Sequence, residues 1–459
     1  MELSPSKDIL NQKIVPLLTE LIQNRCVNDG RPESGQEIRS ALTLKRFFKD
    51  YGLEPEIIEA APGRANLVLR IKGTNPAAPS LGFLNHLDVV PVNEEAWSTN
   101  PFAGEVRGGY VWGRGAVDML NMTATQAVAF AEIVQQKGPL AGDLLFLATA
   151  DEETSGRLGA RWLVENHWPK VKVDYIITEL GGFFFKRDDG HQGITITVGE
   201  KGIIWLKLRI KGKAAHGSLP YACENAAYKA ASVLNRLVSY KRRPCFIKEY
   251  GEMVAASFSS KGLKAMLCDR KKFDQALLKL AKQDEGLAKF FHAASQLTLS
   301  PNIVQAGSKI NIIPDQALVE IDARLLPGQT VEYLIAELNK ILGDLAHDLR
   351  FEISEYYPST SSPLNTPLYE ATKEIIASVY PLATPVPFFI GGVTDGRFFR
   401  SKGTIVYGFS LMNEDLSLTE YARMLHGHDE RISLKSLELS FHYFSQLPLL
   451  FFQKVKLEE

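Results

Sequence analysis

The chain has 459 residues, which is too long for one compact core and predicts two or three domains of roughly 150 residues each. Hydrophobic residues make up 45% and charged residues 23%, as in ordinary folded proteins, so dominant disorder is excluded. With 52 basic and 53 acidic residues the formal net charge is -1, which gives no electrostatic footprint for nucleic acid or an anionic membrane and favours a small-molecule partner.

The sequence shows no sign of secretion or of a membrane span. Residues 1–8 lack the basic start and apolar core of a secretory signal, and no window approaches roughly 18 uninterrupted apolar residues. We therefore expect a cytoplasmic protein without a membrane partner. Its cysteines are scattered without C-x-x-C spacing, which predicts free thiols.

Helices and strands alternate over the first part of the chain. Apolar spacing and glycine stops indicate helices at 9–21, 35–52, 122–137 and 160–166, and strands at 81–85, 144–150 and 175–178. This alternation is typical of a mostly parallel sheet with helices on both faces. The predicted fold class is therefore α/β.

A different unit begins near residue 199, where outward Lys and Arg alternate with inward apolar residues, as in a half-exposed strand. Its further elements are expected as helices at 224–240 and 331–345 and strands at 318–325 and 350–357. We predict that residues 199–358 form an α+β domain inserted into a catalytic domain of residues 1–198 and 359–459. An extra helical segment at about 244–300 would form a lid, a dimer surface or neither.

Residues that can bind a metal follow several of the predicted strands. His86 follows the run L-G-F-L-N, and Glu179 follows Y-I-I-T. The three acids Asp151, Glu152 and Glu153 follow L-L-F-L-A-T-A. In open α/β sheets the chemistry gathers beyond the carboxyl ends of the strands. We therefore expect His86, Glu153 and Glu179 to converge.

Taken alone, these signals have plainer explanations. His86 and Asp88 in H-x-D can be a strand cap beside a turn carboxylate, although Asp88 can also accept the second imidazole N–H. Asp118, in G-R-G-A-V-D-M, lies just before a helix and can be its cap. A carboxylate in that glycine-rich setting can also bridge two metals about 3.5 to 4 Å apart.

Three acids in a row at 151–153 would repel one another after a buried strand unless a cation lies nearby. Because neighbouring side chains point to different sides, Glu153 can ligate while Glu152 faces substrate as a general base. A solvated acidic turn is the alternative. Later in the chain, H-G-H-D-E at 426–430 supplies His426 or His428, and spacing alone does not choose between them.

Together these motifs resemble the dinuclear zinc amidohydrolase and metallopeptidase family of aminoacylase, acetylornithine deacetylase, succinyl-diaminopimelate desuccinylase and glutamate carboxypeptidase. N-H-L-D, G-R-G-A-V-D-M, A-D-E-E-x-S-G, the strand-end glutamate and H-x-x-D-E occur in the family's order between His86 and Glu430. The resemblance implies a mostly parallel-sheet zinc-hydrolase domain with an inserted dimerisation domain, in a homodimer. It also implies two zinc ions per subunit, replaceable by cobalt or manganese.

The resemblance assigns roles to particular residues. His86 and Glu179 would hold one zinc ion, Glu153 and His426 the other, with Asp118 between them, Asp88 orienting His86 and Glu152 as the base. The family's spacing prefers His426 to His428 as the ligand. Its use of glutamate at the position of Glu179 points to N-acyl amino acids or carboxyl-terminal peptide bonds as substrates.

Substrate contacts are implied in the same way. Asn311 and Arg324 lie in segments that resemble those gripping substrate, and Gly392 and Arg397 lie in a loop like the one that holds its carboxylate. His216, in G-x-x-x-H-G-S, is implied to stabilise the oxyanion in a neighbouring subunit's site. The segment at 244–300 departs from the family's pattern.

We therefore expect a zinc-dependent hydrolase that cleaves an amide bond with metal-activated water. Three alternatives remain at this level. A dipeptidase or aminopeptidase of the same family would require a free substrate amine. A catalytically silent binding protein could use the same scaffold, and a dinuclear phosphoesterase would hydrolyse phosphate esters instead.

Overall fold

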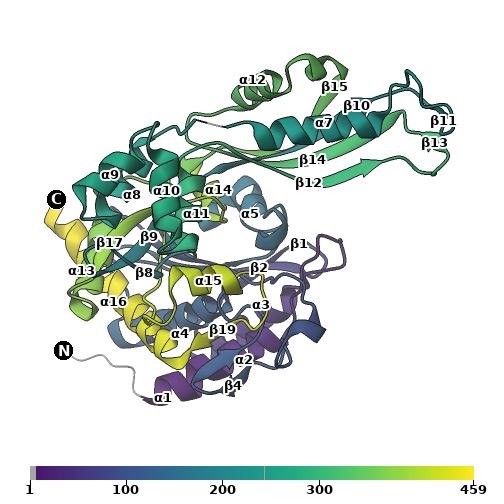
Figure 1. The fold of residues 1–459 in the computed structure, drawn as a ribbon. Helices are drawn as coiled ribbons and strands as arrows, with labels where there is room; N and C mark the ends of the chain where they lie inside the picture. The colour runs from purple at the N-terminus through teal and green to yellow at the C-terminus, as the bar shows by residue number, and fades with distance from the viewer. Residues whose placement is uncertain (1–6, 242, 459) are drawn as a thin grey trace.

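The computed structural model describes residues 7–241 and 243–458. Figure 1 shows two parts, a larger α/β unit and a long arm built on a second sheet that extends beside it. All four cysteines are free thiols, as predicted. Among the described residues, every helix is too short or too polar to span a membrane.

The larger unit is built around one mixed sheet. Its strand order is β1-β2-β6-β3-β7-β18-β9-β16, with β17 and β8 also paired to β9. At its centre β3 runs parallel to β6 and β7, and β18 runs parallel to β7. The strands are β1 (Glu56–Ala61), β2 (Arg64–Ile71), β3 (Leu81–His86), β6 (Leu144–Thr149), β7 (Tyr175–Thr178), β8 (Phe184–Lys186), β9 (Gln192–Glu200), β16 (Thr360–Ser361), β17 (Thr384–Ile390) and β18 (Ile405–Gly408).

Helices cover both faces of this sheet, and the side chains of β6 show why. Leu144 and Phe146 pack into one core, whereas Leu145 and Leu147 pack into another on the opposite face, since successive residues of a strand point to opposite sides. The predicted α/β class with a mostly parallel central sheet is confirmed. The first face is covered by α2 (Val15–Gln23), α3 (Ile38–Asp50), α4 (Leu120–Lys137), α13 (Pro367–Val379) and α16 (Leu434–Glu458), and the second by α5 (Ala160–Asn166), α6 (Trp168–Val171) and α14 (Gly396–Arg400).

The arm contains an antiparallel sheet in the order β12-β14-β10-β15 with its own core. Leu206, Leu208 and Ile210 of β10 point into this core, whereas Lys207 and Arg209 point away from it. The short pair β11 and β13 lies at the far end of the arm (Figure 1). The elements are β10 (Gly202–Lys211), β11 (Ala215–His216), α7 (Ala226–Ser239), β12 (Thr298–Ala306), β13 (Ile312–Ile313), β14 (Gln316–Leu325), α12 (Val331–Leu342) and β15 (Leu349–Tyr357).

The helices of the segment expected at 244–300 pack into the core of the larger unit. Tyr250 and Phe291 are buried in the large core of the α/β unit, and the ring of Phe290 lies 5.2 Å from that of Phe388 on β17. These helices lie within 199–358 by sequence, yet they cover the larger unit. They are α8 (Lys248–Ser257), α9 (Lys261–Leu267), α10 (Phe273–Ala281) and α11 (Glu285–Ala294).

Candidate active site

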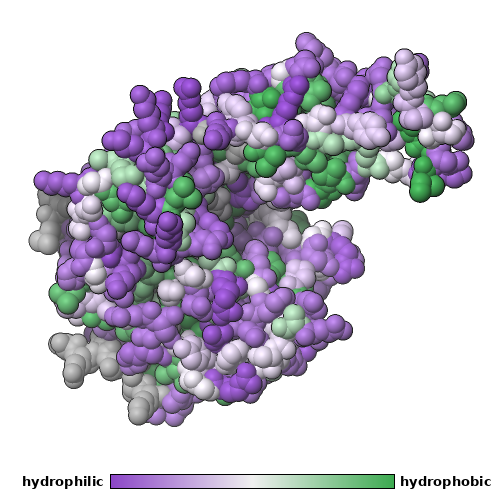
Figure 2. All heavy atoms as spheres, viewed as in Figure 1, coloured by the Kyte–Doolittle hydropathy of each residue, from purple (hydrophilic) through white to green (hydrophobic). Residues whose placement is uncertain are grey.

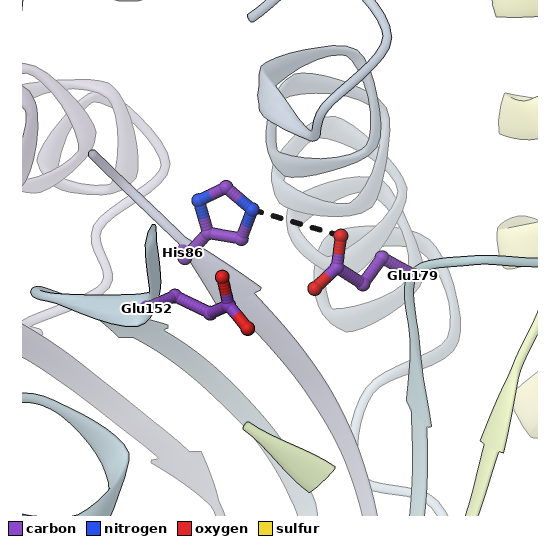
Figure 3. Close-up of side chains that lie close together, drawn as sticks. All are labelled: His86, Glu152 and Glu179. Atoms are coloured by element: carbon purple, nitrogen blue, oxygen red, sulfur yellow. Dashed lines mark ion pairs between the residues drawn. The ribbon is translucent and has the colours of Figure 1, made fainter. Parts of the chain in front are cut away.

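Side chains that can bind a metal converge at the carboxyl ends of three adjacent parallel strands. His86 is the last residue of β3, Glu179 follows β7, and the short helix η3 (Glu152–Thr154) follows β6. Because the strand order is β6-β3-β7, these ends lie side by side. His86 Nε2 is 3.6 Å from Glu179 Oε2, and Figure 3 shows Glu152 pointing toward the same centre.

Asp118 joins this group to a second one. Its Oδ1 lies 3.1 Å from His86 Nε2, and its Oδ2 lies 3.5 Å from His426 Nε2. His426 Nε2 is in turn 3.2 Å from Glu153 Oε2. The two oxygens of one carboxylate therefore face two different imidazoles, each with a glutamate beside it. His426 and His428 are both exposed, but His426 lines the cavity of this site and His428 does not.

Glu430 holds together the two loops that carry Asp118 and His426. Its buried carboxylate accepts backbone N–H groups of Gly115, Val117 and Asp118 at 3.0, 2.7 and 3.0 Å, and Arg114 Nη1 at 2.8 Å. The same segments pair through the sheet of β4 (Glu105–Arg107), β5 (Tyr110–Trp112) and β19 (Arg431–Ser433). We did not predict this role from the sequence, although Glu430 belongs to H-x-x-D-E.

Replacing Glu430 by Gln should weaken metal binding. The glutamine side chain keeps one acceptor oxygen, but its NH2 group replaces the other. Some of the buried N–H groups that Glu430 accepts would therefore lose their hydrogen-bond acceptor. We expect metal affinity and activity to fall about 10- to 100-fold. Glu132→Gln is the matched control, since Glu132 accepts from Lys13 at 2.6 Å outside the site. Equal metal affinity in both variants, measured by chelator competition, would contradict this role.

Asp88 lies under the site with a different contact from the one expected. The nearest acceptor to His86 Nδ1 is the backbone carbonyl of Asp88 at 3.0 Å, whereas its carboxylate Oδ1 is 3.6 Å away. A proton on Nδ1 leaves the lone pair of Nε2 facing Asp118 and Glu179, as a metal ligand requires. The Asp88 carboxylate instead accepts the backbone N–H groups of Glu152 and Glu153 at 3.2 and 3.1 Å.

Burial and mutual repulsion raise the pKa values of three glutamates in this cluster. Burial, with the charge of Asp118, raises the pKa of Glu179 to about 8 and that of Glu153 to about 7. Burial and the charge of Glu179 raise the pKa of Glu152 well above its ordinary value. Hydrogen bonds to Asp118 and Glu153 raise the pKa of His426 to about 10.

The donor set fits divalent metal ions. His86 with Glu152 and Glu179, and His86 with Asp118 and Glu153, offer ligand atoms that all lie within 4.8 Å of one another. Imidazole nitrogen and carboxylate oxygen are ligands that Zn²⁺ accepts. Divalent cations here would also neutralise the repelling carboxylates.

A cavity of about 240 Å³ opens beside the cluster, lined in part by Arg324, Gly392 and Arg397. Arg397 is buried, with Nη1 at 4.0 Å from Glu152 Oε1, and it donates to the carbonyls of Thr394 and Ser155 at 2.6 and 3.0 Å. The fork of Arg324 is already engaged by Asp322 at 2.7 and 3.0 Å.

Two of the predicted site residues lie on the arm, away from both the cavity and the cluster. His216 on β11 and Asn311 beside β13 are exposed at the far end of the arm and do not line the cavity (Figure 1). Within one chain the structure therefore does not bring them to the metal-binding cluster.

Comparison with known proteins agrees with this geometry. Residues 82–449 match the model of peptidase family M20/M25/M40. The chain belongs to this family. It is 28% identical to the N-fatty-acyl-amino acid synthase/hydrolase PM20D1 of Xenopus tropicalis, over 83% of this chain and 74% of that protein. It is 25% identical to a probable succinyl-diaminopimelate desuccinylase of Staphylococcus aureus, over 90% of this chain and 94% of that protein.

A solved structure of the M20 family shares the fold. The M20 metallo-carboxypeptidase Sso-CP2 of Sulfolobus solfataricus aligns with a TM-score of 0.71 at 18% identity, over 96% of this chain and 99% of that one. The match to the family model, together with the curated relatives, confirms the predicted family and enzyme class. This M20 protein is a metal-using hydrolase of amide bonds.

Proposed function

We propose that this M20 enzyme hydrolyses the amide bond of N-acyl amino acids with two zinc ions. The observation that carries the proposal is the position of Asp118, whose two oxygens face His86 and His426 at 3.1 and 3.5 Å. A carboxylate shared between two imidazole-carboxylate pairs is suited to two metals in one site.

His86 and Glu179 would hold one ion, Glu153 and His426 the other, and Asp118 both. When bound, the zinc ions supply Lewis acidity toward the substrate carbonyl and make a water molecule more acidic. The His86 Nδ1 contact with the Asp88 carbonyl fixes the ring so that Nε2 faces the site.

Glu152 is the acid in the cavity best placed to move a proton. The contacts of His426 are with Glu153 and Asp118, so Glu152 is left facing the cavity. Its raised pKa suits it to take a proton from water and give it to the leaving amine. Arg397, 4.0 Å away, can keep the carboxylate oriented.

The positively charged Arg397 beside Glu152 supports a substrate that carries a carboxylate. Arg397 and Gly392 line the same cavity as Glu152, and a guanidinium fork suits a substrate carboxylate. Glutamate at position 179 and the names of the two curated relatives agree with an N-acylated amino acid as substrate.

We further propose that the enzyme is a cytoplasmic homodimer in which each arm completes the partner's site. Figure 2 shows hydrophobic side chains gathered at the end of the arm, and Leu219, Tyr221 and Ile310 there are 69%, 95% and 102% exposed. Exposed apolar groups of this kind are typical of a protein interface. His216 and Asn311, on the same tip, would then reach the neighbouring cavity, where His216 would stabilise the developing oxyanion.

Complementation between two inactive variants tests this arrangement. Glu152→Gln and His216→Ala homodimers should each be inactive, because every site in them lacks one group. After random exchange of subunits, half of the dimers are mixed and hold one complete site each. We therefore expect about one quarter of wild-type activity to return. If mixing restores no activity although exchange is confirmed by mass, His216 does not act across subunits.

A substrate panel tests the proposed function itself. Chelator-treated and zinc-restored protein would be assayed with acetyl, succinyl and long-chain acyl amino acids and with unblocked dipeptides. We expect zinc-dependent release of the amino acid from the acylated compounds and little from the dipeptides. Cleavage confined to substrates with a free amine would instead identify a dipeptidase.

A further inference from the structure

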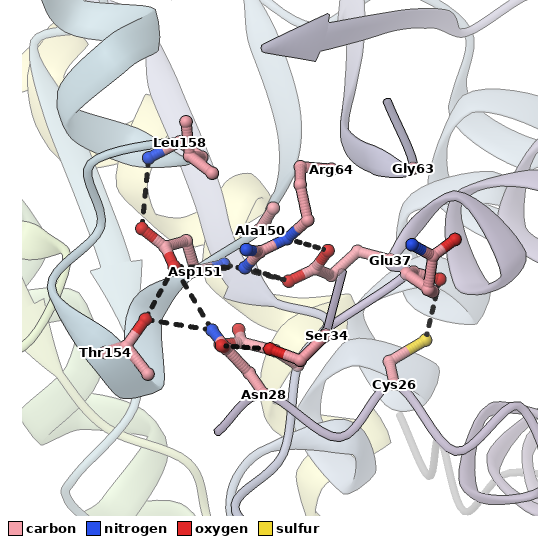
Figure 4. A network of polar contacts seen from close by, with 12 residues as sticks. Cys26, Asn28, Ser34, Glu37, Gly63, Arg64, Ala150, Asp151, Thr154 and Leu158 are labelled. Carbon is pink, nitrogen blue, oxygen red and sulfur yellow. Dashed lines mark hydrogen bonds and ion pairs between the residues drawn. The ribbon is translucent and has the colours of Figure 1, made fainter. Parts of the chain in front are cut away.

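A buried arginine lies behind the site, on the side away from the cavity. Arg64, at the start of β2, has a side chain that is only 3% exposed. Its Nε and Nη2 donate to Glu37 Oε2 and Oε1 at 2.7 and 2.8 Å, and Nη2 also lies 3.0 Å from Asp151 Oδ1 (Figure 4). None of these three residues lines the substrate cavity, so they cannot act on substrate directly.

Asp151 transmits this contact to the turn that carries Glu152 and Glu153. Its backbone has a φ of 68°, in the left-handed region, and its N–H donates to Glu37 Oε1 at 3.2 Å. Its carboxylate accepts the Thr154 hydroxyl at 2.6 Å and the Leu158 N–H at 3.1 Å. The turn from 151 to 158 is therefore folded around one carboxylate that Arg64 holds in place.

Asn28 connects this turn to Asp88. Its side-chain amide lies 2.9 Å from Asp88 Oδ2, 3.2 Å from Asp151 Oδ1 and 3.0 Å from the Thr154 hydroxyl. Asp88 itself accepts the backbone N–H groups of Glu152 and Glu153. Two buried carboxylates therefore hold the acid turn from behind, and Arg64 and Asn28 hold those carboxylates.

We infer that the Glu37–Arg64 pair is a positioning device for Glu152 and Glu153, setting the direction of their carboxylates through Asp151. The inference rests on the proposed roles of these two glutamates. The Arg64 guanidinium lies between the carboxylates of Glu37 and Asp151. Its planar group donates to both carboxylates in a fixed geometry, which a lysine ammonium cannot do. Loss of the fork frees the Asp151 carboxylate to turn and releases the Leu158 N–H that it accepts at the end of the acid turn.

The alternative is that the pair only joins α3 to β2. Lys13–Glu132 provides a control for this, because it is an ion pair at 2.6 Å that joins other elements of the larger unit away from the site. A purely structural pair would change thermal stability, as we expect for Lys13→Met, without changing the turn at 151–158.

Arg64→Lys, which keeps the charge and loses the fork, tests the inference, with Lys13→Met as control. In the metal-free protein, hydrogen exchange of the Leu158 amide, which the Asp151 carboxylate accepts, should become about tenfold faster in Arg64→Lys and stay unchanged in Lys13→Met. In the zinc-loaded protein, kcat should fall about 10- to 100-fold while KM changes little.

Unchanged exchange and kcat in Arg64→Lys would overturn the inference. If that variant does not fold, Glu37→Gln keeps a neutral acceptor for Arg64 and should show the same changes to a smaller degree; wild-type exchange in it would count equally against the inference. The exchange measurement needs no substrate, so it remains decisive even if the proposed activity is wrong.

Discussion

Replacing Glu152 by Gln should abolish turnover and leave metal binding intact. The amide has nearly the same shape but cannot accept the proton of the attacking water, so kcat should fall about 10²- to 10⁴-fold. The side chain lies in the cavity, while the contacts of His426 are with Glu153 and Asp118. Steady-state kinetics and metal analysis of the purified variant measure the two effects.

The adjacent residue supplies the control for this substitution. Glu153→Gln changes the same atoms one position along the chain, but it weakens the group that faces His426 Nε2 at 3.2 Å. This variant should lose metal together with activity. Substantial activity in Glu152→Gln, or equal metal loss in both variants, would remove Glu152 from its role as base.

Removal of metal should abolish activity and destabilise the larger unit. Zinc binds only to the folded protein, because His86, Asp118 and His426 are distant in sequence and meet only on folding. Zinc at a thousand times its Kd therefore adds about 4 kcal/mol to the free energy of unfolding. Thermal unfolding with chelator and with zinc measures the shift. Asp118→Asn should lose most of this shift, since Asp118 faces both imidazoles.

A wild-type unfolding temperature that is insensitive to zinc would contradict a metal centre built from these groups. A surface substitution, Glu165→Gln, serves as the control for Asp118→Asn, because Glu165 is an exposed partner of Arg161 far along α5. That variant should keep the full zinc-dependent shift.

Features set by local sequence were predictable. Runs such as L-L-F-L-A-T identify strands buried on both faces, and parallel strands end at one edge, so the convergence of His86 and Glu179 follows from the order of elements. The position of the turn at 151–153 was also predictable, because it directly follows one of these buried strands.

Contacts that depend on distant segments were not predictable. Glu430 and Asp118 are 312 positions apart, and nothing near Glu430 indicates which amides its carboxylate accepts. The Glu37–Arg64 pair is hidden in the same way. The contact of His86 with the carbonyl rather than the carboxylate of Asp88 depends on a local backbone path that residue spacing does not define.

The helices at 248–294 show the limit of reading domains from chain order. Their apolar spacing indicated helices, but only the buried contacts of Tyr250 and Phe291 reveal that they cover the larger sheet. A segment inserted into one unit by sequence can thus be packed on another.

The place of β18 in the central sheet has a consequence for synthesis of the protein. This strand, formed by Ile405–Gly408, lies between β7 and β9, more than two hundred residues downstream of either, and His426 comes later still. A growing polypeptide on the ribosome must therefore be extended past β18 before the sheet closes, and past His426 before the ion-binding groups meet. Until β18 is made, the facing edges of β7 and β9 stay unpaired, so the nascent chain would depend on chaperones to keep those edges from pairing elsewhere.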